Sequence, residues 1–329
     1  MEERIVSPEP LEGDNSMINL RPRRLGEFIG QEAVVRKLSI AIESAKIRRD
    51  TLDHVLLVGP PGLGKTTLAH IIANEMGSNI YVSSGPVIEK QGDLAAILTS
   101  LERGDVLFID EIHRLNKSVE EILYTAMEDY AVDVMIGKGP SARSIRLSLN
   151  KFTLVGATTK SGLLSSPLRN RFGMTLELDY YSVEDIEKIV ERSSRLLNLK
   201  VEKDAIREIA KRSRGTPRIA NRLLKRIRDF AVVEGKKVVD LEITKKALEI
   251  LEIDEYGLDP MDRKIIKTLL ENFKGGPAGI EAIAASIGVE PNTISEVYEP
   301  FLLREGFIVR TPRGRVATQK AYRLMGYLS

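Results

Sequence analysis

The sequence predicts an α/β domain with a parallel sheet, followed by a small all-α domain and a winged-helix domain. Three observations support this order: short continuous apolar runs in the first half, charged amphipathic helices after Tyr181, and a final helix-turn-helix with a hairpin. We place the three domains at residues 1–181, 182–254 and 255–329. The 329 residues average two domains at roughly 150 residues each, so the last two domains must be small.

The first domain alternates apolar runs with helix-like stretches. Runs that are apolar throughout are typical of parallel strands covered on both faces. The candidate strands are residues 55–58, 80–82, 106–109, 152–156 and 174–178. Between the third and fourth strands, residues 132–136 and 145–149 alternate on either side of a Gly/Pro turn, which predicts an inserted β-hairpin.

The remainder of the chain is expected to be helical until a last hairpin. The second domain has helical spacing without a convincing buried strand, at residues 183–197, 204–212 and 218–234. Residues 254–260 have the composition of a linker. The third domain has helical patterns at residues 262–273, at 280–287 and from Pro291 onward, and a hairpin follows around the turn Thr311–Gly314. This arrangement predicts a winged helix.

The composition excludes several classes of protein. The chain has no cysteine and three histidines, which excludes disulfides, cysteine zinc sites, iron–sulfur clusters and thiol nucleophiles, and disfavours a histidine metal site. No apolar stretch is longer than five residues, far below the roughly 18 needed to cross a bilayer. The N-terminus lacks the pattern of a signal peptide, so we expect a cytoplasmic protein without a membrane segment.

A phosphate-binding loop follows the first strand. Residues 59–66, GPPGLGKT, match the pattern G-x-x-x-x-G-K-[ST] between a strand and a helix. The glycines let backbone N–H groups converge on phosphates, and the helix N-terminus adds partial positive charge. Lys65 is expected to reach the terminal phosphates and the Thr66 hydroxyl to bind Mg²⁺. A glycine-rich turn without a ligand is the alternative.

Two carboxylates follow the third strand. The apolar run 106–109 ends in Asp110 and Glu111, and open α/β sheets bind ligands at the carboxyl ends of their strands. We expect Asp110 in the Mg²⁺ shell and Glu111 orienting the attacking water. A solvated acidic strand end is the alternative. His113 is either near the site or a packing or surface histidine.

Six segments resemble one family. No Asn-Lys-x-Asp motif of a GTPase occurs, so ATP is the expected nucleotide. The segments are GPPGLGKT, LFIDEIH, and residues 155–159, 166–173, 214–218 and 310–315. The chain resembles the AAA+ ATPases, and most closely the RuvB family of bacterial motors for Holliday-junction branch migration. The resemblance covers nearly the whole chain and implies a P-loop AAA+ ATPase domain, a helical lid and a winged-helix DNA-binding domain.

The resemblance implies five catalytic residues. Lys65 and Glu111 keep the roles given above. Thr159 is the polar sensor of the γ-phosphate, Arg171 the arginine finger that enters a neighbouring subunit's site, and Arg218 the second sensor, carried by the lid. Without the resemblance, Thr159 is an ordinary strand end and Arg171 a surface arginine after a turn.

The same resemblance implies ATP or ADP and Mg²⁺ as cofactors. Apolar segments near the N-terminus enclose the adenine, and the loop holds the phosphates. The implied binding residues are Leu20, Arg21, Phe28, Ile29, Gly59, Gly62, Leu63, Gly64, Lys65, Thr66, Thr67, Asp110, Glu128, Asp129, Tyr130, Tyr181, Pro217 and Arg218, with Thr66 and Asp110 also binding the metal. For residues 128–130 and Tyr181, a plain helix-end or linker role is the alternative.

The implied partners are duplex DNA at four-way junctions, further copies of the chain in a hexameric ring, a RuvA-like junction-binding protein and a RuvC-like resolvase. The hairpin 132–149 is the implied docking element for the RuvA-like protein. Exposure of Val134, Met135 and Ile136 would favour this role over that of a scaffold hairpin.

The basic end of the chain is the expected DNA contact. The net charge is +2, but residues 301–329 carry six basic residues and Glu305, which gives +5. Arg310, Arg313 and Arg315 lie in the wing, where contacts to phosphates give affinity without sequence specificity. A solvated helix face is the alternative for such a charge excess.

Two other functions stay open at this point. The first is another AAA+ motor or loader, of the clamp-loader or replication-initiator type. The second is a DNA-binding regulator that holds ATP as a structural ligand. Such a regulator would keep Lys65 and the winged helix, but it would not need Glu111 or Arg171.

Overall fold

The computed structural model describes residues 20–136 and 143–327, without the side chains of residues 134–136 and 143. The chain folds into two compact units. The first unit runs to Leu197 and includes the segment Thr216–Arg218. The second unit comprises Asn198–Gly215 and the chain from Ile219 onward. No helix in the described part of the chain is both long and apolar enough to cross a membrane.

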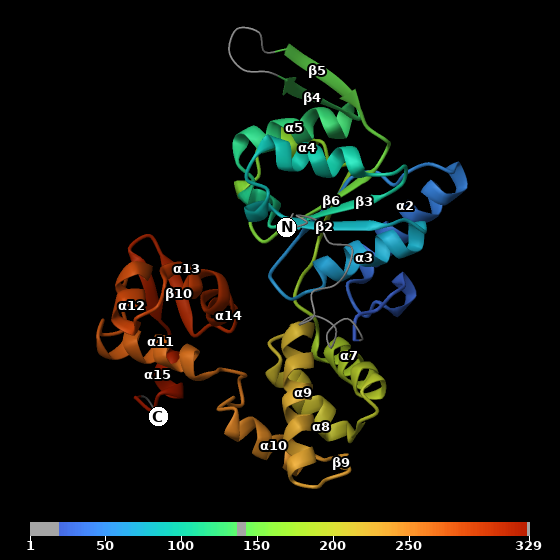
Figure 1. Cartoon of the computed structure of the whole chain (residues 1–329). Helices are drawn as coiled ribbons and strands as arrows, with labels where there is room; N and C mark the ends of the chain where they lie inside the picture. Colours follow the sequence, from blue (N-terminus) through green and yellow to red (C-terminus); the bar gives the residue numbers. More distant parts are fainter. Residues whose placement is uncertain (1–19, 137–142, 328–329) are drawn as a thin grey trace. The chain divides into compact units, whose positions relative to one another are not determined.

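A five-stranded parallel sheet forms the centre of the first unit (Figure 1). Its order is β2-β3-β6-β1-β7, and every strand that the sequence predicted is present. The strands are β1 (Val55–Val58), β2 (Ile80–Ser84), β3 (Val106–Asp110), β6 (Thr153–Thr158) and β7 (Met174–Glu177). Because all strands are parallel, their carboxyl ends meet at one edge of the sheet.

Helices cover this sheet and supply its core. Apolar residues of the strands and of the residues that flank them, such as Leu107 and Phe152, pack with Leu94 of α4 and Leu123 of α5. The helices of this domain are α2 (Glu32–Arg48), α3 (Lys65–Met76), α4 (Gln91–Ser100), α5 (Lys117–Glu128) and α6 (Ser166–Asn170). The first unit also includes α7 (Val183–Leu196), the first helix of the predicted all-α domain. Short 3-10 turns are η1 (Leu25–Glu27), η2 (Gly85–Val87), η3 (Ile112–Arg114) and η5 (Ser161–Leu163).

The predicted hairpin is present as the antiparallel pair β4 (Ala131–Ile136) and β5 (Arg143–Ser148). Ile145 and Leu147 of β5 are exposed apolar residues. The side chains of Val134, Met135 and Ile136, on which the docking expectation relied, lie outside the described residues.

The second unit begins with the helices of the predicted all-α domain. They are α8 (Lys203–Arg212), α9 (Pro217–Val233), whose first turn belongs to the first unit, and α10 (Leu241–Ile250). Contrary to the prediction of helices alone, β8 (Lys200–Val201) and β9 (Val238–Val239) form a parallel pair. Two-residue strands are too short to produce an apolar pattern in the sequence.

The winged helix completes the second unit, as predicted. Its core joins Ile265 and Leu269 to Ile283, Leu302 and Phe307. The helices are α11 (Pro260–Glu271), α12 (Ile280–Ile287), α13 (Pro291–Thr293), the π-helical turn η6 (Ile294–Tyr298), α14 (Glu299–Arg304) and α15 (Gln319–Leu324). The wing strands are β10 (Ile308–Thr311) and β11 (Gly314–Ala317). The helix predicted to begin at Pro291 is thus interrupted by a π turn.

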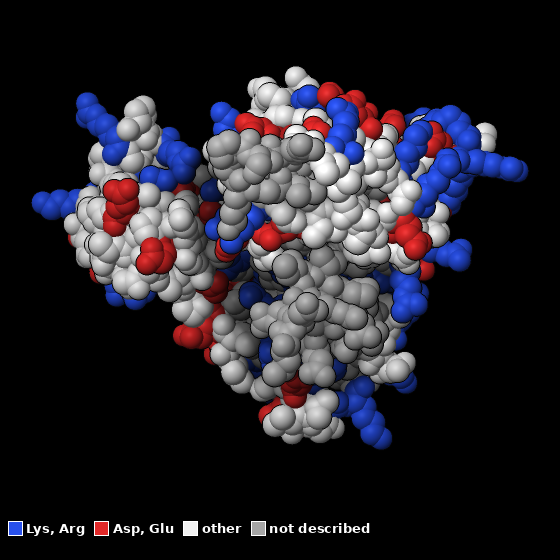
Figure 2. Space-filling view, turned by 45° about the horizontal axis from the view of Figure 1, so that its top comes forward, with Lys and Arg blue, Asp and Glu red and all other residues white. Residues whose placement is uncertain are grey.

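The face shown in Figure 2 carries Lys and Arg side chains interspersed with Asp and Glu side chains. This mixture is what a net charge of +2 over 329 residues leads one to expect.

The wing depends on glycine at position 314. Gly314 has φ +135°, and a Cβ atom there would overlap the carbonyl oxygen of Ala278. Ala278 and Arg315 exchange backbone hydrogen bonds of 2.9 and 2.8 Å. The wing strand therefore approaches the chain before α12 more closely than a side chain at position 314 would permit.

Gly314→Ala should destabilise the winged helix by about 2–4 kcal/mol, because backbone strain and steric overlap add. Hydrogen-exchange protection of β10, β11 and α11 in the intact chain measures this loss. The control is Gly279→Ala, since a Cβ atom on Gly279 would meet no described atom within 4 Å. It should cost at most about 1 kcal/mol, as a poorer N-cap. Equal protection in the two variants would contradict the account.

Candidate functional site

The loop between β1 and α3 wraps around the side chain of Lys65. The ammonium group donates hydrogen bonds to the carbonyl oxygens of Gly59 (2.7 Å) and Pro60 (2.8 Å), and Lys65 is only 7% exposed. Burial lowers the pKa of Lys65, while the charges of Asp110 and Glu111 raise it. Lys65 is the first residue of α3, so its amine lies near the N-terminus of this helix, which attracts anions.

Glycine is required along this loop. Gly59, Gly62 and Gly64 have φ values of +149°, +80° and +106°. A Cβ on Gly59 would lie 2.5 Å from the carbonyl oxygen of Leu178. The backbone can therefore follow this path only with glycines, because other residues would be strained or would overlap their neighbours. Thr66 and Thr67 follow in the first turn of α3.

Asp110 and Glu111 leave β3 at the same edge of the sheet. Asp110 ends the strand, and its Oδ1 accepts a hydrogen bond of 3.0 Å from the backbone N–H of Glu111. Glu111 has φ +49° and begins the turn into η3. The negative charges of both carboxylates raise the pKa of Lys65, so both lie near its amine. The structure thus brings together the loop and the two acids that the sequence singled out.

The end of β6 adds a polar pair beside these acids. Thr159 directly follows Thr158, the last residue of β6, which pairs with Val58 at the end of β1. The buried Thr158 hydroxyl lies 2.9 Å from Nδ1 of His113, and Nε2 of His113 lies 3.4 Å from Oε2 of Glu111. Sequence reasoning missed Thr158 and left His113 open. The only signal was the position of His113 two residues after Glu111.

Aromatic and apolar residues cover the other side of the loop. Phe28 would lie 3.1 Å from a Cβ on Gly64. The Tyr181 hydroxyl donates a hydrogen bond of 3.0 Å to the carbonyl oxygen of Leu63, and burial raises the pKa of Tyr181. Leu20 is buried, while Arg21 and Ile29 are partly exposed in the same N-terminal segment. Phe28 and Tyr181 therefore lie against the phosphate loop.

The first turn of α9 packs on the loop. The Arg218 backbone N–H donates a hydrogen bond of 3.4 Å to the carbonyl oxygen of Gly62. The side chains of Thr216 and Arg218 would lie 2.8 and 3.2 Å from a Cβ on Gly62. Pro217 begins the helix, where a fixed φ is favourable. Arg218 also lowers the pKa of Lys65, so its charge lies close to that of the amine.

Arg171 lies at the opposite edge of the sheet from the loop of its own chain. It shortly precedes Met174, which pairs with Val55 at the amino end of β1. Its guanidinium binds Glu128 (Nη2 to Oε2, 3.0 Å) and lies 4.6 Å from the centre of the Tyr124 ring. The four residues of β1 separate this edge from the loop by about 13 Å.

Glu128, Asp129 and Tyr130 occupy that same amino-terminal edge. Asp129 binds Arg146 of the hairpin at 2.6 Å, and the Tyr130 ring packs edge-on against Phe152, 5.9 Å between centres. We expected these three residues to line the nucleotide pocket. In their own chain, the length of β1 lies between these residues and the loop.

The three wing arginines differ in their surroundings. Glu299 is a buried carboxylate, with its side chain 2% exposed, and it binds Arg315 (2.8 Å) and Arg310 (3.0 Å). The Arg315 side chain is 15% exposed and that of Arg310 is 59% exposed. Arg313 lies exposed at the tip of the turn, without an ion pair to any described residue. Arg315 therefore mainly neutralises Glu299, while Arg310 and Arg313 are the more exposed of the three.

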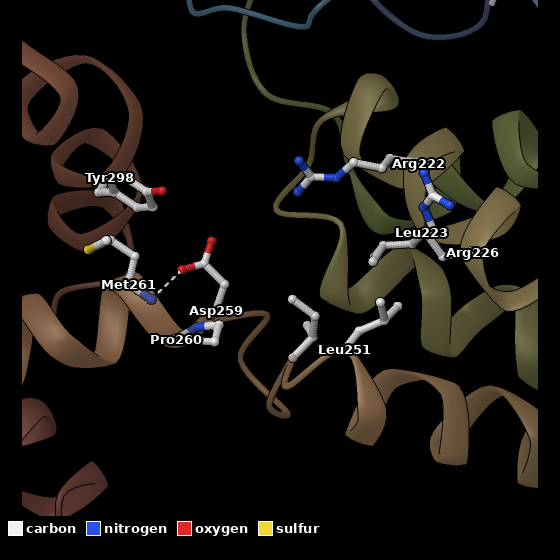
Figure 3. Close-up of a pocket in the computed structure, with 9 residues that line it drawn as sticks. Arg222, Leu223, Arg226, Leu251, Asp259, Pro260, Met261 and Tyr298 are labelled. Carbon is white, nitrogen blue, oxygen red and sulfur yellow. Dashed lines mark hydrogen bonds between the residues drawn. The ribbon is translucent and has the colours of Figure 1, made fainter. Parts of the chain in front are cut away.

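The second unit contains a pocket of its own (Figure 3). Asp259 lies at its wall and accepts a hydrogen bond of 2.9 Å from the backbone N–H of Met261 (Figure 3), which caps α11. The lining residues are Arg222, Leu223, Arg226, Leu251, Ile253, Asp259, Pro260, Met261 and Tyr298. No residue that the sequence singled out lines this pocket.

The fold and the loop define the class of protein. A parallel sheet of order β2-β3-β6-β1-β7 carries a phosphate loop after β1 and two acids after β3. The first turn of α9, which belongs to the same unit, brings Arg218 to the loop. These features define a P-loop ATPase of the AAA+ type, which binds a nucleotide.

Comparisons with known proteins narrow the class to one family. Three family models match the chain: "Holliday junction DNA helicase RuvB P-loop domain" at residues 20–178, "RuvB AAA lid domain" at 181–254 and "RuvB C-terminal winged helix domain" at 255–326. The chain therefore belongs to the RuvB family.

Individual relatives are similar over nearly their whole length. The Holliday junction branch migration complex subunit RuvB of Kosmotoga olearia is 64% identical over 99% of this chain and 95% of its own. The corresponding protein of Thermotoga maritima is 61% identical over 98% and 96%. A solved structure described as the Thermotoga maritima RuvB Holliday junction branch migration motor has a TM-score of 0.86 and 58% identity, covering 94% of this chain and 99% of its own.

Proposed function

We propose that this chain hydrolyses ATP to drive translocation of double-stranded DNA, and so powers branch migration of Holliday junctions in recombination and DNA repair. The observation that carries the proposal is the shared edge of the sheet, where Lys65, Asp110, Glu111 and Arg218 meet. The names of the relatives, branch migration subunits and a branch migration motor, support the same activity.

The residues at this edge divide the reaction between them. Lys65 and the loop amides bind the terminal phosphates. Arg218, carried by the lid, contacts the phosphates, so that hydrolysis changes the position of the lid. Glu111 orients and polarises the attacking water, because hydrolysis of a phosphoanhydride needs a positioned nucleophile. Thr159 donates a hydrogen bond to the γ-phosphate or to that water. Phe28 and Tyr181 hold the adenine side of the nucleotide.

Thr66 and Asp110 supply oxygen ligands for Mg²⁺. Within residues 20–136 and 143–327, no group of three or more His, Asp or Glu residues is arranged to hold a metal ion. Mg²⁺ fits this donor set, because it usually binds one or two protein oxygens and takes its other ligands from phosphates and water. When bound, the ion neutralises charge on the phosphates.

Arg171 acts on the nucleotide of a neighbouring subunit. Its position at the amino-terminal edge supports this assignment, because that edge faces away from the loop of its own chain. Glu128 and Tyr124 hold the guanidinium in place. Each nucleotide site then requires two subunits, which favours a ring; six subunits is the number in the family. A guanidinium finger is worth about 10³- to 10⁵-fold in rate in other NTPases.

The winged helix binds duplex DNA through its wing, with Arg313 and Arg310 as the phosphate contacts. The hairpin at residues 132–149 binds a RuvA-like junction protein, and Ile145 and Leu147 offer it exposed apolar surface. A RuvC-like resolvase completes the assembly. We keep residues 1–181, 182–254 and 255–329 as the ATPase, lid and DNA-binding domains.

Lys65→Ala should abolish the activity while leaving DNA binding intact. We expect ATP hydrolysis to fall at least about 100-fold, because the charge on the terminal phosphates loses its main partner. Phosphate release and the movement of a four-way junction, with the RuvA-like partner present, measure the effect. Lys37→Ala on the exposed face of α2 is the control. A wild-type protein that moves no junction, or a Lys65→Ala protein that does, would sink the proposal.

Arg313→Ala should weaken duplex binding about three- to tenfold and lower the slope of log affinity against log salt by about one, because one phosphate contact is lost. Basal ATP hydrolysis should not change. Arg323→Ala removes the same charge from exposed surface of α15 and should have a smaller effect. Arg315→Ala is unsuitable as a probe, because it leaves the buried Glu299 short of a partner. Equal binding by Arg313→Ala and wild type would refute the wing contact.

A further inference from the structure

His113 is buried between a carboxylate and a strand. It lies in the short turn η3, and its side chain is 5% exposed. Its two ring nitrogens face different partners: Nδ1 lies 2.9 Å from Oγ1 of Thr158, and Nε2 lies 3.4 Å from Oε2 of Glu111. The imidazole therefore connects the end of β6 to the acid that orients water in the proposed reaction.

The hydrogen bonds of Thr158 favour one direction for this connection, because Nδ1 of His113 is the acceptor that they offer to the hydroxyl proton. The Thr158 Oγ1 accepts a hydrogen bond of 3.0 Å from the backbone N–H of Lys160. Its own proton can then be donated to Nδ1 of His113. A neutral imidazole that accepts at Nδ1 carries its proton on Nε2, which faces the carboxylate of Glu111. In this arrangement the Thr158 hydroxyl donates to Nδ1, and the protonated Nε2 lies 3.4 Å from the carboxylate of Glu111.

Thr158 is itself tied to the phosphate loop. Its carbonyl oxygen accepts a hydrogen bond of 3.1 Å from the backbone N–H of Gly59, the first residue of the loop. It also directly precedes Thr159, the proposed sensor. A shift at the end of β6 would thus reach Glu111 through one hydroxyl and one imidazole ring.

We infer that His113 is a positioning residue for ATP hydrolysis, which holds the carboxylate of Glu111 through Nε2–H and couples it through Thr158 to the strand that carries the sensor. This inference rests on the proposed ATP hydrolysis. Under this inference, His113 positions the carboxylate of Glu111, and it does not simply fill space or bind the nucleotide.

The first test separates positioning from binding. His113→Ala in the full-length protein should lower kcat for ATP about tenfold, because a misplaced catalytic group costs up to about 100-fold. The KM for ATP should stay within about twofold, because His113 is placed to act through Glu111 and not on the nucleotide. A kcat within about twofold of wild type would overturn the inference.

A matched pair of variants guards against a purely structural effect. In His113→Gln the amide nitrogen reaches the place of Nε2 and can still donate to Glu111, so kcat should return to within about threefold of wild type. In His113→Asn the amide reaches only the place of Nδ1, so kcat should stay low. Equal activity of the two variants, at equal melting temperature, would overturn the inference.

A third measurement does not depend on catalysis. The chain has only three histidines, so the ¹⁵N spectrum of its imidazole rings can be assigned by comparison with His113→Gln. We expect the ring of His113 to carry its proton on Nε2. A proton on Nδ1 alone would contradict the inference even if the wild type hydrolyses ATP. A wild type that fails to hydrolyse ATP, with the Nε2 tautomer present, would instead refute the proposed function.

Discussion

The parallel sheet of order β2-β3-β6-β1-β7 is the constraint on which the rest of the structure depends. Parallel strands deliver all of their carboxyl ends to one edge, so residues far apart in the sequence meet there. Lys65 after β1, Glu111 after β3 and Thr158 at the end of β6 share this edge. The backbone bond from Gly59 to Thr158 and the contacts of His113 tie these strand ends together. The proposed hydrolysis of ATP depends on these residues lying at one edge of the sheet.

The same constraint separates the chain's own loop from Arg171, the proposed arginine finger. Arg171 precedes β7 at the amino-terminal edge, beside Glu128 and Tyr124. A molecule with a site at one edge and a complementary group at the other can complete its sites only head to tail. Head-to-tail contacts of this kind close into rings when the rotation between subunits permits it. Our central claim is therefore that each complete ATP site belongs to two subunits.

The sequence alone predicted the strands, the hairpin, the winged helix and the loop, because each leaves a local pattern of apolar residues, glycines or charges. It did not reveal the pairing of Arg315 with Glu299 or of His113 with Thr158, since these pairs depend on how distant segments pack. It did not show that Tyr130 lies at the edge of the sheet away from the loop of its own chain, because family resemblance does not say which subunit supplies a residue. The short strands β8 and β9 left too little pattern to detect.

Mixing two inactive variants tests the central claim most directly. Glu111→Gln subunits keep Arg171, and Arg171→Ala subunits keep Glu111, so a mixed ring contains some interfaces with both groups. ATP hydrolysis should return on mixing, with about one quarter of the sites complete in a random equimolar ring. If the mixture hydrolyses ATP no faster than the average of the two variants alone, Arg171 does not act on a neighbour's nucleotide and the account is contradicted.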